Sequence, residues 1–190
     1  GSTGPLNAEQ ATMVMLQHNN ILRLQKIVDH ILDLSRLESG RATIRPVRLD
    51  AGPLVEEVAK GYQVLADAKG VRIHVAVPAD LPPVHADPDL LAQLLGNLLD
   101  NAVRFTSSRI DLKVEALSGV DAVKSGRSGG PLLAERGCVR FCVSDDGRGI
   151  PENRVGDIFK RFVQVDRPSG GEAYKGTGLG LAICKEIVER

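Results

Sequence analysis

The chain has 190 residues, with 24 Lys and Arg balanced by 24 Asp and Glu, so its formal net charge is zero. This balance gives no electrostatic reason to expect nucleic acid or an anionic membrane as a partner. No apolar run reaches the length needed to cross a bilayer, so we expect no membrane segment in this chain. Because Trp is absent and aromatic residues make up only 3%, we expect a core of Leu, Val, Ile and Ala.

The ends of the chain and its cysteines indicate the cellular setting. Residues 1–7 are interpreted as a tag or linker. Cys138, Cys142 and Cys184 are scattered and lack a His at zinc-ligand spacing. Buried free thiols in a reducing compartment explain them, which predicts a cytoplasmic protein. Any membrane anchor of the natural protein would lie outside this chain.

Residues 8–39 are predicted to form one long helix. Leu24, Ile27, Ile31 and Leu34 recur at steps of three and four, and Gly40 is a natural stop. About 30 residues give a rod of about 45 Å, which is longer than one small domain covers. We therefore expect this helix to pack on bundle helices that the chain does not supply.

Alternating elements follow. Residues 43–49 are expected to form a short strand, and Asp50 to cap a helix that runs to about residue 68. Residues 71–77 alternate as a strand, and a loop with four prolines follows.

Residues 87–106 are predicted to form a helix with an informative polar strip. Asp87 is a good N-cap and Pro88 takes the first helical position. Beside the broad apolar face lie Gln93, Asn97, Asn101 and Arg104. Such a row of amide oxygens and donors, ending in a cation, suits a phosphate chain and its metal ion. The alternative is a polar helix edge that faces water.

Two further strands, residues 109–116 and 138–144, are predicted around a Gly- and Ser-rich loop over residues 118–137. The second strand runs into the motif D-x-G-x-G-I, which starts at Asp145. Its glycines let a backbone turn approach a flat ligand, and its carboxylate can accept from an exocyclic amine such as that of adenine. An ordinary tight turn is the alternative.

The last part of the chain contains a second glycine-rich motif. Residues 151–157 are predicted to form a short helix, and the two Phe residues within 158–162 to anchor a flexible segment over residues 163–175. The motif G-T-G-L-G-L, residues 176–181, opens the last helix and offers backbone N–H groups to an anion. It lacks the G-K-[ST] ending of a P-loop, and no strand directly precedes it as in a Rossmann turn.

The order of these motifs resembles the ATP-binding domain of sensor histidine kinases, within the superfamily that includes DNA gyrase B and MutL-type repair proteins. The resemblance covers residues 13–190, and residues 35–40, S-R-L-E-S-G, resemble the end of the second helix of the kinase dimerisation hairpin. It implies an α/β sandwich of the Bergerat type, whose mixed sheet is covered on one face by three helices and preceded by one long bundle helix. Residues 8–40 would be the partial dimerisation and phosphotransfer helix, and residues 41–190 the ATP-binding catalytic domain without its final strands.

The resemblance also assigns roles to residues. Asn101 would coordinate a Mg²⁺ ion that bridges the ATP phosphates, and Asp145 would hold the adenine amino group. The other implied ATP-binding positions are Asn97 and Arg104 along the phosphate path, Gly147, Gly149 and Ile150 at the turn, Phe159 and Phe162 at the base of a lid, and Gly176, Thr177, Gly178, Leu179 and Gly180 around the triphosphate.

One position bears on the reaction. Hydrolysing members of the superfamily carry a Glu one turn before the metal-binding Asn, where it activates water as a general base. Asn97 stands there in this chain and cannot take a proton. The sequence therefore favours transfer of the γ-phosphoryl group over hydrolysis.

Three departures from the family pattern limit the prediction. No His is followed directly by an acidic residue with a Pro a few positions on: His18 precedes two Asn residues, and His30, His74 and His85 lie outside any motif. No catalytic residue is therefore expected in this chain, and this fragment alone should not phosphorylate itself. Gln164 occupies a lid position where many relatives have Arg, and the chain stops at Arg190, before the strands that complete the sheet in relatives.

We therefore expect the chain to bind Mg-ATP and to donate the γ-phosphoryl group to a His on a dimerisation helix of the same or another kinase protomer. A response regulator receiver domain would be the partner in this two-component signalling. The alternatives are a degenerate, non-catalytic module that signals by helix pairing, and a serine/threonine kinase of the same superfamily, as in anti-sigma factors.

Overall fold

The computed structural model describes residues 4–40, 42–118, 137–165 and 176–190. The chain divides into two compact units, which are described separately below. One unit spans residues 43–156, and the other combines residues 1–42 with residues 157–190. The predicted loop over residues 118–137 and the predicted flexible segment over residues 163–175 lie mostly outside the described residues.

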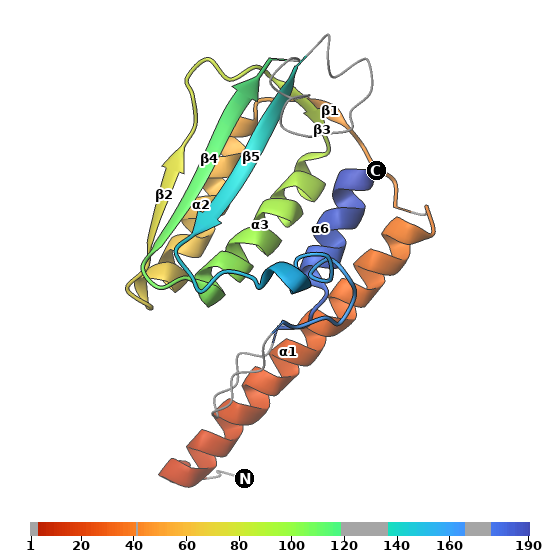
Figure 1. Cartoon of the computed structure of the whole chain (residues 1–190). Helices are drawn as coiled ribbons and strands as arrows, with labels where there is room; N and C mark the ends of the chain where they lie inside the picture. The colour runs from red at the N-terminus through yellow and green to blue at the C-terminus, as the bar shows by residue number, and fades with distance from the viewer. Residues whose placement is uncertain (1–3, 41, 119–136, 166–175) are drawn as a thin grey trace. The chain divides into compact units, whose positions relative to one another are not determined.

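The unit of residues 43–156 is built on a mixed three-stranded sheet (Figure 1). Its strands are β2 (Arg72–Ala76), β4 (Arg109–Leu117) and β5 (Cys138–Asp145), in the order β2-β4-β5. Strand β4 runs parallel to β2 and antiparallel to β5. The three predicted strands and the mixed character of the sheet are confirmed.

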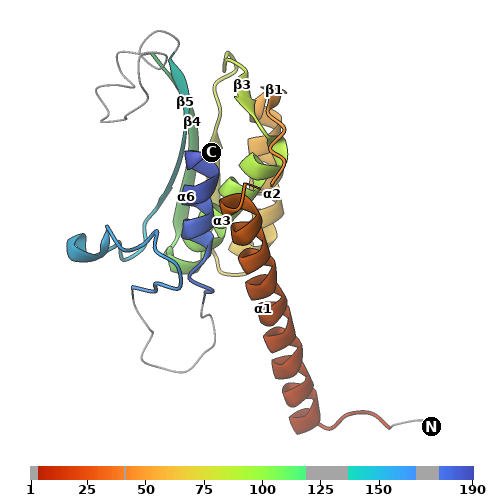
Figure 2. The same ribbon diagram turned by 90° about the vertical axis from the view of Figure 1, so that its right-hand side faces the viewer.

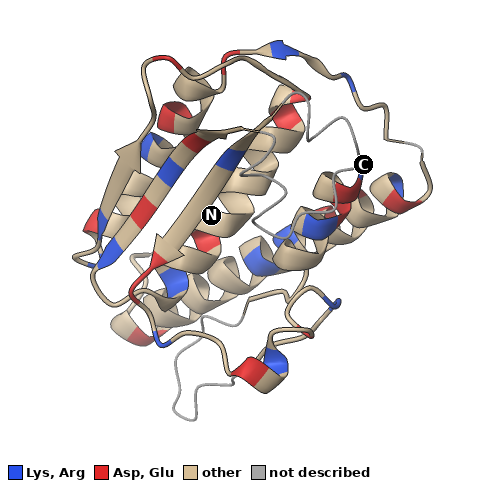
Figure 3. Ribbon diagram, turned by 45° about the horizontal axis from the view of Figure 1, so that its top comes forward, with Lys and Arg blue, Asp and Glu red and all other residues tan. Residues whose placement is uncertain are grey.

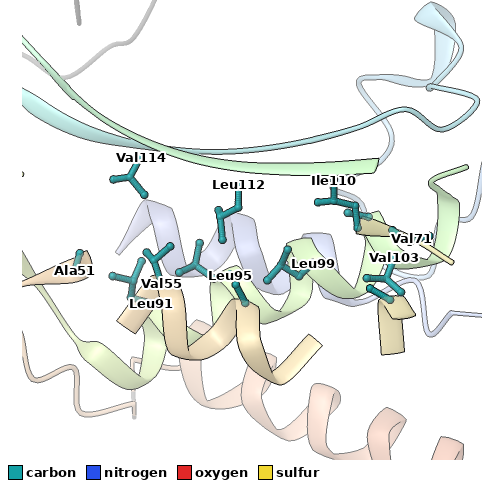
Figure 4. Close-up of a cluster of buried hydrophobic side chains, with 13 residues drawn as sticks. Ala51, Val55, Val71, Leu91, Leu95, Leu99, Val103, Ile110, Leu112 and Val114 are labelled. Carbon is teal, nitrogen blue, oxygen red and sulfur yellow. The ribbon is translucent and has the colours of Figure 1, made fainter. Parts of the chain in front are cut away.

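Two helices of this unit, α2 (Ala51–Asp67) and α3 (Pro88–Phe105), lie on the same side of the sheet (Figure 2). Along β4 the side chains of Ile110, Leu112 and Val114 alternate inward, and Figure 4 shows them facing the helices. They meet fully buried Leu95 and Leu99 of α3 in a core of aliphatic residues, as the composition predicts. The last helix, α6 (Gly180–Glu189), belongs to the other unit.

A second, two-stranded sheet pairs β1 (Val47–Leu49) with β3 (Val84–Ala86) in antiparallel fashion. Strand β1 is shorter than the predicted residues 43–49. Strand β3 was not predicted, because its three residues follow a Pro pair that favours a loop and its partner lies far away in sequence.

Both helix starts of this unit carry the caps that the sequence predicts. Asp50 accepts a hydrogen bond from the Gly52 backbone N–H at 3.2 Å. Asp87 accepts from the N–H groups that follow it in α3 and, at 2.8 Å, from the N–H of Arg45. These donors hold the pKa of the Asp87 carboxyl below its usual value, the Arg45 N–H contributing most. Residues 151–157 form only a short 3₁₀ turn, η1 (Glu152–Arg154), instead of the predicted helix.

In the other unit, α1 (Ala8–Glu38) is a single helix of 31 residues that begins with a capping box between Asn7 and Gln10 and ends one residue before the predicted end. Its C-terminal part, where Leu34 and Leu37 are buried, packs along α6 (Figure 1). Most of its other large apolar side chains are 44–64% exposed: Met13, Val14, Met15, Leu16, Ile21, Leu22, Leu24, Val28, Ile31 and Leu32. This exposure agrees with the prediction of partner helices outside the chain.

Charges of both signs occur in both units, and they alternate along β4 (Figure 3). On β4, Asp111 pairs with Arg109 at 2.7 Å, and Glu115 pairs with Arg140 of β5. Within the described ranges, no helix is both long and apolar enough to span a membrane.

The three cysteines are free thiols, and of these only Cys184 is buried. Burial raises the pKa of the Cys184 thiol to about 12.

Candidate nucleotide-binding site

The polar strip of α3 contains a buried polar group without a hydrogen-bond partner among the residues that the structure describes. This group is the side-chain nitrogen Nδ2 of Asn97, whose N–H groups donate to none of those residues. One turn later, Asn101 is half-buried on the same helix. Buried polar groups are nearly always hydrogen-bonded, so an orphaned amide indicates a place where a bound molecule completes the bonding. The predicted strip is therefore suited to a polar ligand.

Arg104 has a partner that the sequence analysis missed. Its guanidinium contacts the Asp100 carboxylate one turn earlier at 3.2 Å, and both side chains are half-buried. Burial and the nearby Asp100 charge also raise the pKa of the Tyr62 hydroxyl. The cation that ends the strip is thus balanced by a carboxylate. The i, i+4 spacing of Asp and Arg on a helix was the available signal.

The D-x-G-x-G turn begins where β5 ends and lies against the end of α3. The Asp145 Oδ1 atom accepts a hydrogen bond from the Gly147 N–H at 2.9 Å, which leaves the exposed carboxylate further acceptor capacity. A Cβ atom at Gly147 would lie only 2.4 Å from the Phe105 carbonyl oxygen and 2.6 Å from Asp145 Oδ1. Gly149 has φ +71°, a conformation that other residues rarely adopt. Gly147 thus lets the turn pack closely against the end of α3, and Gly149 supplies a backbone conformation that the turn needs; the predicted approach of the turn to a flat ligand stays a prediction.

Two more side chains of this region are exposed. Ile150 is exposed after the turn. The Arg148 guanidinium lies 5.6 Å from the centre of the Phe105 ring, within the range of a cation–π contact. This contact joins the turn and the end of α3 a second time.

Asp146, which the sequence analysis passed over, has more hydrogen-bond partners than its neighbour Asp145. Its Oδ1 accepts from the Thr106 hydroxyl and from three consecutive backbone N–H groups, and its Oδ2 accepts from the Ser108 hydroxyl at 2.6 Å. The hydroxyl and N–H donors hold the pKa of the Asp146 carboxyl far below its usual range, the Ser108 hydroxyl contributing most. The Thr-Ser-Ser run directly after α3 was the signal for such a carboxylate.

The glycine-rich motif lies in the other unit, where backbone contacts close its base. The Phe162 N–H donates to the Gly178 carbonyl at 2.8 Å, and the Gln164 amide donates to the Gly176 carbonyl at 2.6 Å. A Cβ atom at Gly178 would come within 2.8 Å of the Phe162 backbone. The predicted anchoring by Phe rings differs from what is found, because Phe159 and Phe162 are 44% and 64% exposed. The backbone, rather than buried rings, holds this segment.

The motif also contacts α1 within its unit. The Thr177 hydroxyl accepts a hydrogen bond from Leu179 N–H at 3.2 Å, just before α6 begins at Gly180, and it lies 3.1 Å from Nδ1 of His30. An open cavity of about 310 Å³ lies beside this contact. It is lined by Arg23, Ile27, Phe162, Gln164, Gly176 and Thr177. The N-terminus of α6 supplies the positive helix end that the sequence predicts for an anion.

The predicted site residues therefore fall into two groups. One unit carries Asn97, Asn101, Arg104, Asp145, Gly147, Gly149 and Ile150; the other carries Phe159, Phe162, Gly176, Thr177, Gly178, Leu179 and Gly180. Within the described residues, no three His, Cys, Asp or Glu side chains gather into a metal cage. A magnesium ion fits such a site only if substrate phosphates and water supply most of its ligands, which is its usual mode of binding.

Comparisons with known proteins agree with this chemistry. Residues 86–190, more than half of the chain, match the family described as "Histidine kinase-, DNA gyrase B-, and HSP90-like ATPase". The adaptive-response sensory kinase SasA of Synechococcus elongatus is 30% identical over 171 residues, which cover 90% of this chain and 40% of SasA. The chain thus spans less than half the length of this relative.

Solved structures show the same fold. ShkA, whose full-length crystal structure contains AMPPNP, is 31% identical with a TM-score of 0.74, over 98% of this chain and 35% of ShkA. The nucleotide-free catalytic domain of the histidine kinase ThkA is 26% identical with a TM-score of 0.54, over 76% of this chain and 82% of that domain. The chain has the histidine kinase ATPase fold, an α/β arrangement with a mixed sheet. It belongs to the family of histidine kinase-, DNA gyrase B- and HSP90-like ATPases, and its relatives are sensor histidine kinases.

Proposed function

We propose that this chain binds Mg-ATP and donates the γ-phosphoryl group to a histidine on a dimerisation helix that the chain does not contain. The observation that carries the proposal is the close packing of the Asp145–Gly147 turn against the end of α3. It brings a carboxylate suited to the adenine amino group next to the helix that carries the Asn97 and Asn101 amides. A purine base and a metal-bound phosphate chain together fit this combination.

The proposed roles follow the two groups of residues. Asp145 would accept from the adenine amino group, Asn101 would hold Mg²⁺, and the ion would neutralise phosphate charge when bound. Asn97 and Arg104 would line the phosphate path, Ile150 and the glycines of the turn would face the base, and the two Phe residues would flank the lid. The glycine-rich residues Gly176, Thr177, Gly178, Leu179 and Gly180 would donate backbone hydrogen bonds to the triphosphate.

Transfer, rather than hydrolysis, is supported by the chemistry of Asn97. The bond between the γ-phosphorus and the bridging oxygen of ADP would break as a bond to the acceptor imidazole nitrogen forms. An Asn amide cannot remove a proton from water, so the site lacks the general base that hydrolysing relatives carry at this position. Alignment of donor and acceptor is then the main contribution that this chain makes.

The exposed apolar side chains of α1 support the partner proposal. We propose that residues 8–40 pair with dimerisation helices of the same or another protomer, and that residues 41–190 form the ATP-binding domain. The family match runs from residue 86 to residue 190 and so includes sequence from both units. A response regulator receiver domain would take the phosphoryl group next, in a cytoplasmic two-component pathway.

Calorimetric titration with ATP and Mg²⁺ tests nucleotide binding directly. Asp145→Asn and Asn101→Asp should each weaken binding about tenfold or more, because one loses the adenine acceptor and the other changes the metal ligand. Asp111→Asn, which alters a carboxylate on the outer face of the same sheet, is the control and should bind like the wild type. Equal binding by all three variants would contradict the assigned site.

Phosphotransfer is tested separately, by mixing the chain with labelled ATP and a supplied acceptor hairpin. Label on the hairpin histidine supports the proposal. Rapid release of free phosphate without labelled hairpin would show that the chain is a hydrolase instead.

A non-catalytic module is the second candidate, and two contacts favour it. The Arg104 cation is already paired with Asp100, and Gln164 is a neutral residue whose amide is bonded to the Gly176 carbonyl, so neither offers an unpaired positive charge to a γ-phosphate in this structure. A folded wild-type chain that gives no heat of binding with Mg-ATP, yet dimerises through α1, would establish this alternative.

A further inference from the structure

Asp146 links the turn after β5 to the connection between α3 and β4. Its carboxylate binds the connection between α3 and β4, residues 106–109, through five hydrogen bonds of 2.5–3.1 Å. Its backbone N–H donates to the Arg109 carbonyl at 3.3 Å. Because Asp146 directly follows Asp145, each of these bonds also restrains the D-x-G-x-G turn, which contains the carboxylate proposed to bind adenine.

Most of the hydrogen bonds to the Asp146 carboxylate end on one of its two oxygen atoms. Four of the five end on Oδ1, and only the Ser108 hydroxyl binds Oδ2. Hydrogen bonds to an ionised carboxylate are about twice as strong as neutral ones. An Asn side chain keeps one carbonyl oxygen in the Oδ1 position and can keep these four bonds in weaker form, whereas Ala loses all five.

We propose that Asp146 is a positioning residue for base selection: it holds the Asp145 carboxylate at a set place relative to α3 without itself touching the nucleotide. This inference rests on the proposed function. An adenine base presents an amino donor to Asp145, whereas a guanine base presents a carbonyl oxygen, which a carboxylate repels. The preference for adenine therefore depends on where the turn holds Asp145, while the metal and triphosphate contacts of α3 do not read the base.

Because the turn packs closely against α3, a small shift of the turn should change the preference for adenine strongly. The Gly147 Cα lies so near the Phe105 carbonyl that a single added carbon would come within 2.4 Å of it. A turn released from Asp146 can move away from α3, and supporting residues around a binding site commonly change affinity by about tenfold to a hundredfold when removed.

The test compares affinities for Mg-ATP and Mg-GTP by calorimetry at neutral pH, using the whole chain. Asp146→Ala should weaken ATP binding about tenfold and leave GTP binding nearly unchanged, so that the ATP/GTP preference falls by the same factor. Asp146→Asn should restore most of that preference. Glu115→Gln removes a paired carboxylate five residues from Ile110, the partner of Asp145 in the sheet, and should keep the wild-type preference.

The ratio of the two affinities separates positioning from simple stabilisation, because a partly unfolded sample lowers both affinities equally. An Asp146→Ala chain that melts earlier but keeps the wild-type ATP/GTP ratio would overturn the inference. If that variant does not fold, Ser108→Ala removes only the Oδ2 bond and should lower the ratio about threefold; an unchanged ratio there would also overturn it. A wild-type chain that binds neither nucleotide would refute the proposed function itself.

Discussion

Replacing Gly147 by Ala places a methyl group where the backbone leaves no room. The added Cβ would lie 2.4 Å from the Phe105 carbonyl oxygen, 2.9 Å from its carbon and 2.6 Å from Asp145 Oδ1, whereas ordinary contacts begin at 3.4 Å. The turn and the end of α3 must therefore separate by about 1 Å. Overpacking of this kind costs about 1–3 kcal/mol.

Thermal unfolding and nucleotide titration measure the two consequences. For a chain of this length, 1 kcal/mol corresponds to about 2–4 °C, so Gly147→Ala should lower Tm by about 2–12 °C. The displaced Asp145 also loses its bond from the Gly147 N–H, and we expect the affinity for Mg-ATP to fall about tenfold or more.

Two other glycines provide matched controls. Gly149 has no atom within 4 Å of an added Cβ but has φ +71°, so Gly149→Ala should cost about 1 kcal/mol through backbone strain alone. Gly156 has neither a close neighbour nor a positive φ, and Gly156→Ala should be neutral or stabilise by about 0.5 kcal/mol. If Gly147→Ala behaved like Gly156→Ala in both assays, the close approach of the turn to α3 would be wrong.

Three further predictions concern stability. Leu99→Ala should destabilise the fold by about 2–5 kcal/mol in urea titration, because Leu99 is fully buried in the core; a loss below 1 kcal/mol would contradict that packing. Asp87→Ala should cost about 1 kcal/mol, seen as a lower Tm, since it removes the cap of α3 and the bond from Arg45; an unchanged Tm would show that the cap is dispensable. The pKa of Asp146 is lowered on folding, so its stabilisation is complete above the unfolded carboxyl pKa of about 3.9 and is lost as the pH falls further; Asp146→Asn should flatten the acid limb of the stability curve, and an identical limb would contradict the lowered pKa.

Long capped helices were predictable because their signals are local. Asp87 and Pro88 mark the start of α3, and its apolar spacing continues to Phe105, so the sequence predicts its bounds to within a residue. Strand β3 could not be predicted in the same way. Its three residues are stable only as partners of Val47–Leu49, and neither segment carries enough alternation to indicate the pairing.

The site shows the same contrast between local and distant causes. Asp145 and Gly147 were identified through a resemblance, and the structure adds the reason that only Gly fits against Phe105. Asp146 was missed because it binds the hydroxyl run after α3, which lies outside the D-x-G-x-G motif. Asp100 was missed because it is not itself part of the polar strip, although its partner Arg104 is. Supporting interactions of this kind depend on which segments meet in the folded structure, so the spacing of residues in the sequence indicates them only weakly.

The backbone contact between Phe162 and Gly178 has a consequence for which amino acid can stand at residue 178. Their backbones are joined by one hydrogen bond and approach too closely for any side chain at residue 178. The Gln164 amide and the Gly176 carbonyl form a second hydrogen bond between the same two segments. The two hydrogen bonds hold residues 162–164 against residues 176–178, so a side chain at residue 178 would push these two segments apart. Residue 178 therefore accepts only glycine, whereas residue 164 needs only a side chain that can donate to the Gly176 carbonyl.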